Sequence, residues 1–287
     1  MVCTAEDQCH DAGTCDPATG SCSSPAKPDG TTCDDGNTGT YDDQCMTGRC
    51  GGTEGGLRNF LCYRSTITPG TPPFVPITGI RLVDPFESLT VMMRRPRALC
   101  AVAAVNGQQT AEDPVFLESI RDRQLPGPTP FVRQTVHVTN VLGTFSIDML
   151  KPAWILMPSV ERARESIPPA DNYECYWTRF TRGTPGLAKN TRLTISSAFT
   201  SLPKLFKVKR PRHLCVPTDM NGQGVPEAAA PPVLCYRLRG VAGQPKHHRV
   251  RGLAVRNEFG FQTLNTIREH EICLPSAIAG SGLRADD

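Results

Sequence analysis

The sequence predicts an all-β fold, with two tandem β-sandwich-like domains that follow a small disulfide-rich module at the amino terminus. Three observations lead to this prediction. A unit with a spaced pair of cysteines recurs along most of the chain, alternating apolar and polar residues fill each unit, and 26 prolines and 25 glycines separate these stretches. Period-two alternation between Gly and Pro punctuation is typical of half-buried strands. The helical signal is weak throughout.

Six of the thirteen cysteines form three similarly spaced pairs. Their members lie 38, 40 and 38 residues apart: Cys62 with Cys100, Cys175 with Cys215, and Cys235 with Cys273. A fourth copy of the unit carries Ser119 and Leu156 at these positions, so both of its cysteines are missing together. The two ends of one covalent bond would be lost as a couple, whereas metal ligands or free thiols would not. The spacing therefore predicts three disulfides and an oxidising compartment.

The other features of the unit recur in the same order. A short apolar run and a Gly/Pro turn precede an alternating stretch, and a second strand and the closing cysteine position follow. A polar residue stands two positions before the apolar residue that ends the alternating stretch: Asp84, Asn140, Ser197 or Asn257. A single unit of this kind cannot bury its apolar face alone, so we expect the units to pack against one another.

The four units group in twos. Their ranges are 57–108, 115–164, 172–223 and 233–278. Asn106-Gly107-Gln108 after the first unit matches Asn221-Gly222-Gln223 after the third, and a proline-containing segment at 166–171 reads as a linker. We therefore expect β domain 1 at 57–165, β domain 2 at 172–279 and a flexible tail at 280–287, since each domain has a size that supports one core.

The amino-terminal segment, residues 1–50, is a different kind of module with almost no aliphatic residues. Its seven cysteines are Cys3, Cys9, Cys15, Cys22, Cys33, Cys45 and Cys50. Disulfides must hold such a segment together, and the absence of a Cys-x2-Cys pair argues against zinc. Because seven is odd, one thiol is free, or is bonded to another chain or to residues outside this sequence. The glycine-rich segment 51–56 is expected to be a flexible tether.

Charge is distributed unevenly. Residues 1–56 hold ten acidic and two basic side chains (net −8), and the remainder holds 29 basic and 18 acidic (net +11). Such asymmetry can orient partners or mark an anionic-ligand surface, although two independently soluble modules would also explain it. No apolar run is long enough to span a membrane. The sequence starts without a hydrophobic signal region, so we expect it to follow a removed leader or to be a fragment with an added Met1.

Motifs of the common catalytic and cofactor-binding classes are absent, and the six histidines share no repeat position. Acidic residues at 34–37 and 42–43 offer calcium ligands, but they lack the spacing of a calcium loop and equally suit turns. We therefore expect no enzymatic activity, no metal site and no cofactor, with calcium as the alternative.

Two basic clusters are candidates for ligand binding. One comprises Lys204, Lys207, Lys209, Arg210 and Arg212, and the other Lys246, His248, Arg249 and Arg251. On strands, Lys207 and Lys209 share one face, as do Arg249 and Arg251, so these four residues are proposed to contact an anionic ligand. The alternative is a pair of solvated strand faces that discourage edge-to-edge aggregation. Interleaved aromatic residues are missing, so nucleic acid is not expected.

Two family resemblances bear on location. Residues 3–22, CTAEDQCHDAGTCDPATGSC, resemble disulfide-rich tandem repeats of large secreted and cell-surface proteins of environmental Gram-negative bacteria. That resemblance covers about residues 3–50, and these repeats usually have a cysteine where Gly39 stands here, which would explain the odd count. The Leu-Cys-Tyr … Leu-Cys … Asn-Gly units resemble an uncharacterised repeat domain of the same kind of exported proteins. The resemblances imply secretion or a cell-surface location and supply no catalytic residues.

Together these features predict a non-enzymatic, extracellular structural or adhesive protein. It would be a subunit of a surface layer, filament or appendage, with other protein subunits as partners. The alternative is a secreted binding module for glycans or another anionic polymer, acting through the basic strand faces.

Overall fold

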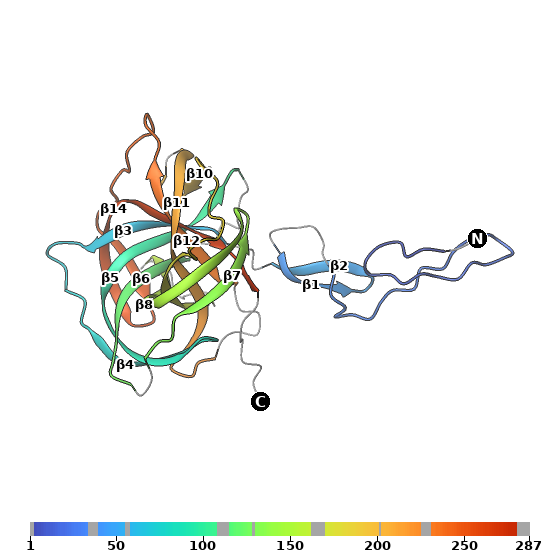
Figure 1. Cartoon of the computed structure of the whole chain (residues 1–287), viewed down its shortest axis with the longest axis horizontal. Helices are drawn as coiled ribbons and strands as arrows, with labels where there is room; N and C mark the ends of the chain where they lie inside the picture. Colours follow the sequence, from blue (N-terminus) through green and yellow to red (C-terminus); the bar gives the residue numbers. More distant parts are fainter. Residues whose placement is uncertain are drawn as a thin grey trace. The chain divides into compact units, whose positions relative to one another are not determined.

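A computed structural model describes residues 3–33, 40–54, 58–107, 115–127, 130–161, 170–200, 202–224 and 231–279. All its regular elements are β-strands, which confirms the predicted all-β class (Figure 1). The described part contains no helix that is long and apolar enough to cross a membrane. The chain divides into two compact parts, an amino-terminal module at Met1–Leu57 and a β body at Arg58–Asp287.

Disulfides hold the amino-terminal module together, as predicted. The bonds are Cys3–Cys22, Cys9–Cys45 and Cys33–Cys50. Cys9 and Cys45 are almost completely buried, so this sulfur bridge takes the place of an apolar core. Cys15 is the one free cysteine among the described residues. The candidate calcium ligands at 34–37 and 42–43 lie outside the residues whose side chains are described.

A hairpin completes this module and corrects one prediction. Strands β1 (Thr40–Met46) and β2 (Arg49–Glu54) pair around Thr47 and Gly48, whose φ angles of 50° and 75° suit a tight hairpin turn. Residues 51–54 were expected to form part of a flexible tether, but they belong to β2 because their backbone pairs with β1. The remainder of that segment, 55–56, lies outside the described residues.

The β body is built around eight antiparallel strands that pair in a closed ring (Figure 1). In ring order, which is also chain order, they are β3 (Phe60–Ile67), β5 (Ser88–Val105), β6 (Phe116–Gln124), β8 (Gly143–Glu161), β9 (Asn172–Phe180), β11 (Lys204–Met220), β12 (Val233–Gly240) and β14 (Gly260–Pro275). Strand β14 pairs with β3 and closes the ring. Each sequence repeat contributes two neighbouring strands, and closure leaves the ring without an edge.

Each repeat also has a shorter strand that pairs with the first half of the long strand after it. These are β4 (Ile77–Val83), β7 (Gln134–Asn140), β10 (Arg192–Ser197) and β13 (Leu253–Asn257). They also pair with the far end of a long strand two repeats away: β4 with β11, β10 with β5, and β13 with β8. Strand β7 pairs with β15 (Ala277–Ala279), which follows β14. The first repeat is thus tied to the third, and the second to the fourth.

The matching Asn-Gly motifs lie at this exchange. Asn106 accepts a hydrogen bond from the backbone N–H of Thr194 at 3.0 Å, and Asn221 accepts one from Arg81 at 3.0 Å. Both asparagines have positive φ angles, 52° and 59°, which asparagine tolerates better than most residues. The motif therefore ends a long strand and fastens it to the opposite repeat.

The predicted border between domains at 57–165 and 172–279 is wrong. Strands β8 and β9 flank the supposed linker and pair directly, from Ile147 with Phe180 to Leu156 with Tyr173. The repeats group in twos because alternate repeats exchange strands across one closed sheet. Residues 162–169 of the linker region and the tail at 280–287 lie outside the described residues.

Both faces of the ring strands are buried. In β3, Phe60 and Cys62 face the ring interior, while Leu61 and Tyr63 belong to the core between the ring and the shorter strands. Burial on both faces explains the continuous apolar runs that open the repeats. The hairpins formed by the shorter strands pack over the ring as a second layer, so the predicted sandwich-like packing of β layers occurs within one body.

Candidate functional site

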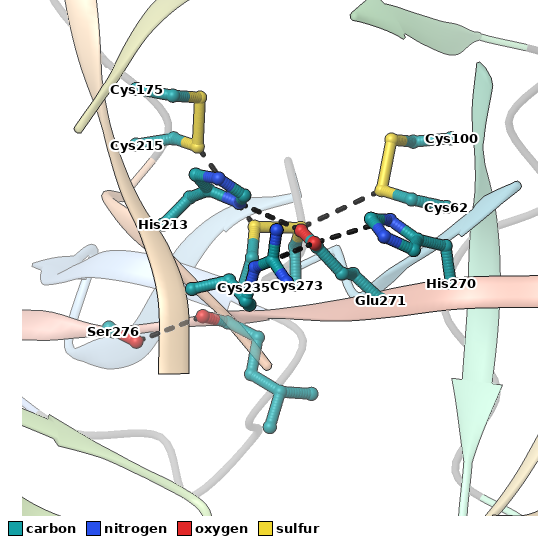
Figure 2. The surroundings of a disulfide bond; sticks show 12 residues. Cys62, Cys100, Cys175, His213, Cys215, Cys235, His270, Glu271, Cys273 and Ser276 are labelled. Carbon is teal, nitrogen blue, oxygen red and sulfur yellow. Dashed lines mark hydrogen bonds and ion pairs between the residues drawn. A yellow bond between two sulfur atoms is a disulfide. The ribbon is translucent and has the colours of Figure 1, made fainter. Parts of the chain in front are cut away.

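One layer of side chains inside the ring holds the three repeat disulfides (Figure 2). The bonds Cys62–Cys100, Cys175–Cys215 and Cys235–Cys273 each join directly paired residues of neighbouring strands, which confirms the pairing predicted from spacing. The bridges also lie close to one another. The Sγ atoms of Cys62 and Cys273 are 3.7 Å apart, and those of Cys215 and Cys235 are 4.0 Å apart.

The repeat without cysteines obeys the same register. Ser119 of β6 pairs directly with Leu156 of β8, and both side chains are almost completely buried. Leu156 packs in the same cluster as the disulfides. In this repeat, two buried side chains therefore replace the bridge and fill its place in the layer.

A cavity of about 1420 Å³ extends from this layer toward the surface. Its innermost residues include Cys62, Cys100, Ser119, Leu156 and Cys273, and its walls are side chains further along the same strands. Eleven Lys or Arg residues line it: Arg64, Arg97, Lys204, Lys209, Arg210, Arg212, Arg237, Arg239, Lys246, Arg249 and Arg268. Among the described residues, two acidic side chains do so, Glu269 and Glu271.

Glu269 already has a cationic partner. It accepts a hydrogen bond from Lys204 Nζ at 2.6 Å, and both side chains are largely buried. The ring of His247 lies 3.7 Å from the same carboxylate. Because Glu269 is paired with Lys204, it does not neutralise the other cations of the wall.

Glu271 is held in the same way, next to the disulfides (Figure 2). Its Oε2 lies 2.8 Å from His213 Nδ1, and its Oε1 lies 3.2 Å from His270 Nδ1 and 3.7 Å from Arg212 Nε. Burial raises the pKa of Glu271, but the charge and hydrogen bond of His213, with the charges of His270 and Arg212, outweigh burial and hold that pKa below its usual value. Both carboxylates of the cavity thus already have partners within the protein.

Like charges face one another on the strands that line the cavity. Arg64 pairs across strands with Arg268, and Lys207 with Arg239. Like charges directly opposite on neighbouring strands destabilise a sheet. Desolvation lowers the pKa of Lys209, and the charges of Lys207 and Arg239 lower it further. The folded chain therefore carries repulsion that an anion in the cavity would relieve.

The same repulsion acts on Arg97. Desolvation lowers its pKa, and the charges of Arg95, Arg121 and Arg64 contribute next. Arg95 and Arg121 are themselves directly opposite in the pairing of β5 with β6. Within the described part of the chain, no acidic side chain forms an ion pair with any of these four arginines.

Two indole rings contribute the flat part of the wall. Trp154 and Trp177 have ring centroids 5.4 Å apart, and His213 packs against both of them. The guanidinium carbon of Arg212 lies 4.9 Å from the centroid of the Trp177 ring, a cation–π contact. The tryptophans, the imidazole and the arginine form one cluster of tilted, mutually contacting groups beside the disulfides.

The four predicted anionic-ligand residues separate into two pairs. Lys209 and Arg249 line the cavity, whereas Lys207 and Arg251 do not. The Lys207 ammonium donates to Asn190 instead. Of the wider clusters, Lys204, Arg210, Arg212 and Lys246 also line it.

Sequence reasoning missed five arginines of the wall: Arg64, Arg97, Arg237, Arg239 and Arg268. A signal for two of them was present, because Arg64 and Arg237 each stand two residues after the first cysteine of a repeat. Residues two apart on a strand share a face, so this position lies one step from the disulfide layer on the inner face of the ring.

A second group of titratable side chains lies apart from the cavity lining. Asp84, Glu87, Asp122 and Glu174 influence one another, and Glu174 is completely buried. Burial, followed by the charges of Asp122, Asp84 and Glu87, raises the pKa of Glu174 well above its usual value. Burial also raises the pKa of Glu87 to about 7 and that of Asp122 to about 6.

Metal ligands are scarce in the described residues. Their one group of His, Cys, Asp and Glu atoms close enough to hold an ion is Cys9, Cys33 and Cys50. All three sulfurs are in disulfides and cannot serve as thiolate ligands.

No family model, curated protein or solved structure matches this chain.

Proposed function

We propose that this chain is an exported, non-catalytic binding protein that holds an anionic ligand in the cavity of its β body. The observation that carries the proposal is the unbalanced charge of the wall, with eleven Lys or Arg residues against two carboxylates that already have partners. A concave site lined by cations with low-dielectric walls concentrates anions and speeds their association. Six disulfides support an oxidising environment, and hence export.

The test is direct binding of acidic and neutral polymers to the full chain. Isothermal titration calorimetry with polygalacturonate, heparin and neutral dextran should give binding to an acidic polymer and none to dextran. The affinity should fall as salt is raised, because exposed charges are screened. Binding that is unaffected by salt, or that is equal for dextran, would contradict the proposal.

Variants of residues in the outer part of the cavity test whether the ligand binds in the cavity. Replacing Lys209, Arg239 and Arg249 by Gln together should weaken binding by at least about tenfold, since three screened charges of the wall are removed at once. The matched control replaces three exposed cations outside the cavity lining, Arg123, Arg182 and Lys189, by Gln. Equal losses in the two triple variants would move the binding away from the cavity.

A second candidate function follows from the charge of the amino-terminal module. Residues 1–56 carry ten acidic and two basic side chains, so the module of one copy has the charge that the cavity of another copy would attract. A head-to-tail contact of this kind generates rings or filaments and would make the chain a structural subunit of a surface assembly. Light scattering across salt and protein concentration tests this candidate. A strict monomer at low salt would exclude it.

A further inference from the structure

The inner end of the cavity is closed. Beneath the layer of cysteines, Phe60, Leu117, Tyr173 and Val233 stand two residues further along their strands, all of them buried in the same cluster. Two layers of packed side chains therefore block the ring, because protein interiors of this kind leave no passage for a polymer. A polymeric ligand therefore cannot pass through the ring and must enter the cavity with one of its ends.

The end of such a ligand would contact the residues just outside the cysteine layer. They stand two positions from the disulfide layer on their strands: Arg64, Ala98, Trp154, Trp177, Arg237 and Glu271. Ala98 is the small member and leaves room beside Arg64, its partner across strands β3 and β5. Glu271 is occupied by His213, so among the cavity-lining residues at this depth Arg64 and Arg237 are the cations that lack an ion pair with a described residue.

Arg64 and Arg237 are placed to act on one terminal group. Their strands, β3 and β12, both pair with β14, so two strand spacings, about 10 Å, separate the backbones. Arginine side chains are long enough to converge from that separation, and their planar guanidinium groups suit carboxylate, sulfate or phosphate oxygens. The indole rings of Trp154 and Trp177 line the same depth.

The lining disfavours other classes of chain. A peptide that binds by strand addition needs a free sheet edge, and the closed ring has none. A lipid acyl chain would meet guanidinium groups that it cannot hydrogen-bond. Single-stranded nucleic acid needs aromatic rings spaced along its path, and the two tryptophans lie together at the inner end with ring centroids 5.4 Å apart.

Resting on the proposed function, we infer that the cavity binds the end of an acidic glycan chain. Arg64 and Arg237 hold the carboxylate or sulfate of the terminal sugar, whose ring lies beside Trp154 and Trp177. The volume of about 1420 Å³ exceeds the roughly 300–1,000 Å³ of a usual small-molecule site, so further sugar units occupy the outer part. Lys209, Arg239 and Arg249 line that part of the cavity.

Stoichiometry distinguishes end binding from binding along a polymer. Linear oligogalacturonates of increasing length are titrated into the full chain by calorimetry, and the complexes are sized by analytical ultracentrifugation. End binding predicts a fixed number of proteins per glycan molecule at every length above the shortest that fills the cavity. If the number of bound proteins rises in proportion to length, the acidic polymer binds but end recognition is wrong. If no acidic glycan binds at all, the proposed function fails as well.

Variants of the inner residues provide a second measurement. Arg64→Gln and Arg237→Gln should each weaken binding of short oligomers by about tenfold to hundredfold, which corresponds to the loss of one hydrogen-bonded charge. Ala98→Phe should fill the inner end and give the same loss, and circular dichroism checks its fold. The two arginines are exposed, so their variants keep the test valid if Ala98→Phe does not fold. Unchanged affinity of both arginine variants for short oligomers would overturn the inference.

Discussion

The side-chain amide of Asn140 donates a hydrogen bond to the hydroxyl oxygen of Tyr236 at 3.0 Å, although 96 residues separate them. Asn140 is the last residue of β7 in the second repeat, and Tyr236 follows the first cysteine of the fourth. The same turn position makes an equivalent contact in every other repeat: Asp84 with Tyr176, Ser197 with Tyr63, and Asn257 with Glu118. Each contact joins repeats on opposite sides of the ring, so the four turn residues hold the closed sheet together.

Removing one of these contacts should destabilise the whole β body. Asn140 donates from Nδ2 to Tyr236 and to Ser276, and its Oδ1 accepts from the N–H of Leu142. Asn140→Ala should lower the free energy of unfolding by about 1–3 kcal/mol, because buried partners lose their hydrogen bonds. Chemical denaturation measures this.

A double-mutant cycle assigns the loss to the contact across the ring. Tyr236→Phe removes the partner hydroxyl, and the double variant should cost less than the sum of the two single variants. Additive costs would show that Asn140 acts only within its own turn.

The sequence predicted these turn residues as a repeated position, but it could not predict what they touch. The apolar alternation and the cysteine spacing are local and identified strands and bridges correctly. Strand exchange between the first and third repeats depends on closure of the ring, which no local pattern encodes. The match of Asn106 with Asn221 therefore suggested two copies of a domain, when each residue reaches across to the other's repeat.

The candidate site was predictable only in part for a related reason. Lys209 and Arg249 were found because they lie in dense basic clusters, whereas Arg64 is the one charge of the apolar strand β3 and Arg237 shares β12 with Arg239 alone. Their importance comes from the depth at which closure places them. A strand face can be read from periodicity, but the convergence of eight such faces on one interior cannot.

The disulfide layer should tolerate the replacement of one bridge by the serine and leucine pair of the second repeat. Replacing Cys62 and Cys100 by Ala should lower the free energy of unfolding by about 4 kcal/mol for the 38-residue separation, from loop-closure entropy. The double variant Cys62→Ser, Cys100→Leu copies Ser119 and Leu156 of the second repeat. It should lose less stability than the double Ala variant, because the leucine refills the layer. Denaturant unfolding of both variants measures the difference. Equal stability of the two would mean that packing in this layer contributes little.

Cys15 should be the one reactive thiol among the described cysteines. The other twelve are in disulfides, and the Cys15 side chain is partly exposed. Alkylation of the native, unreduced chain followed by mass spectrometry should therefore give one modification, at Cys15. A Cys15→Ser variant should give none and should also lose any covalent dimer seen on a non-reducing gel. Alkylation at Cys62 or Cys273 in native material would contradict the bonded interior.

Stability should fall as pH rises from mildly acidic to neutral. Burial raises the pKa of Glu118 to about 7, although a hydrogen bond from Asn257 opposes it, and burial raises that of Glu87 to about 7. A carboxyl group whose folded pKa is raised binds more protons in the folded state. Its contribution is complete below the unfolded pKa, near 4.5, and is lost as pH rises through about 7. Denaturation midpoints at about pH 5 and about pH 8 should therefore differ, with the higher value at pH 5.

The variant Glu118→Gln tests the cause of this slope. Glutamine keeps the shape and can still accept the hydrogen bond from Asn257, which lies 2.7 Å from Glu118 Oε2, but it does not titrate. The variant should be more stable than the parent at pH 8 and should lose part of the pH dependence, on the order of a few kcal/mol. Glu271 works in the opposite direction, since its lowered pKa makes its contribution disappear in acid, below the usual range of glutamate. A midpoint that rises steadily from pH 5 to pH 8 in the parent would contradict the raised folded pKa values of Glu118 and Glu87.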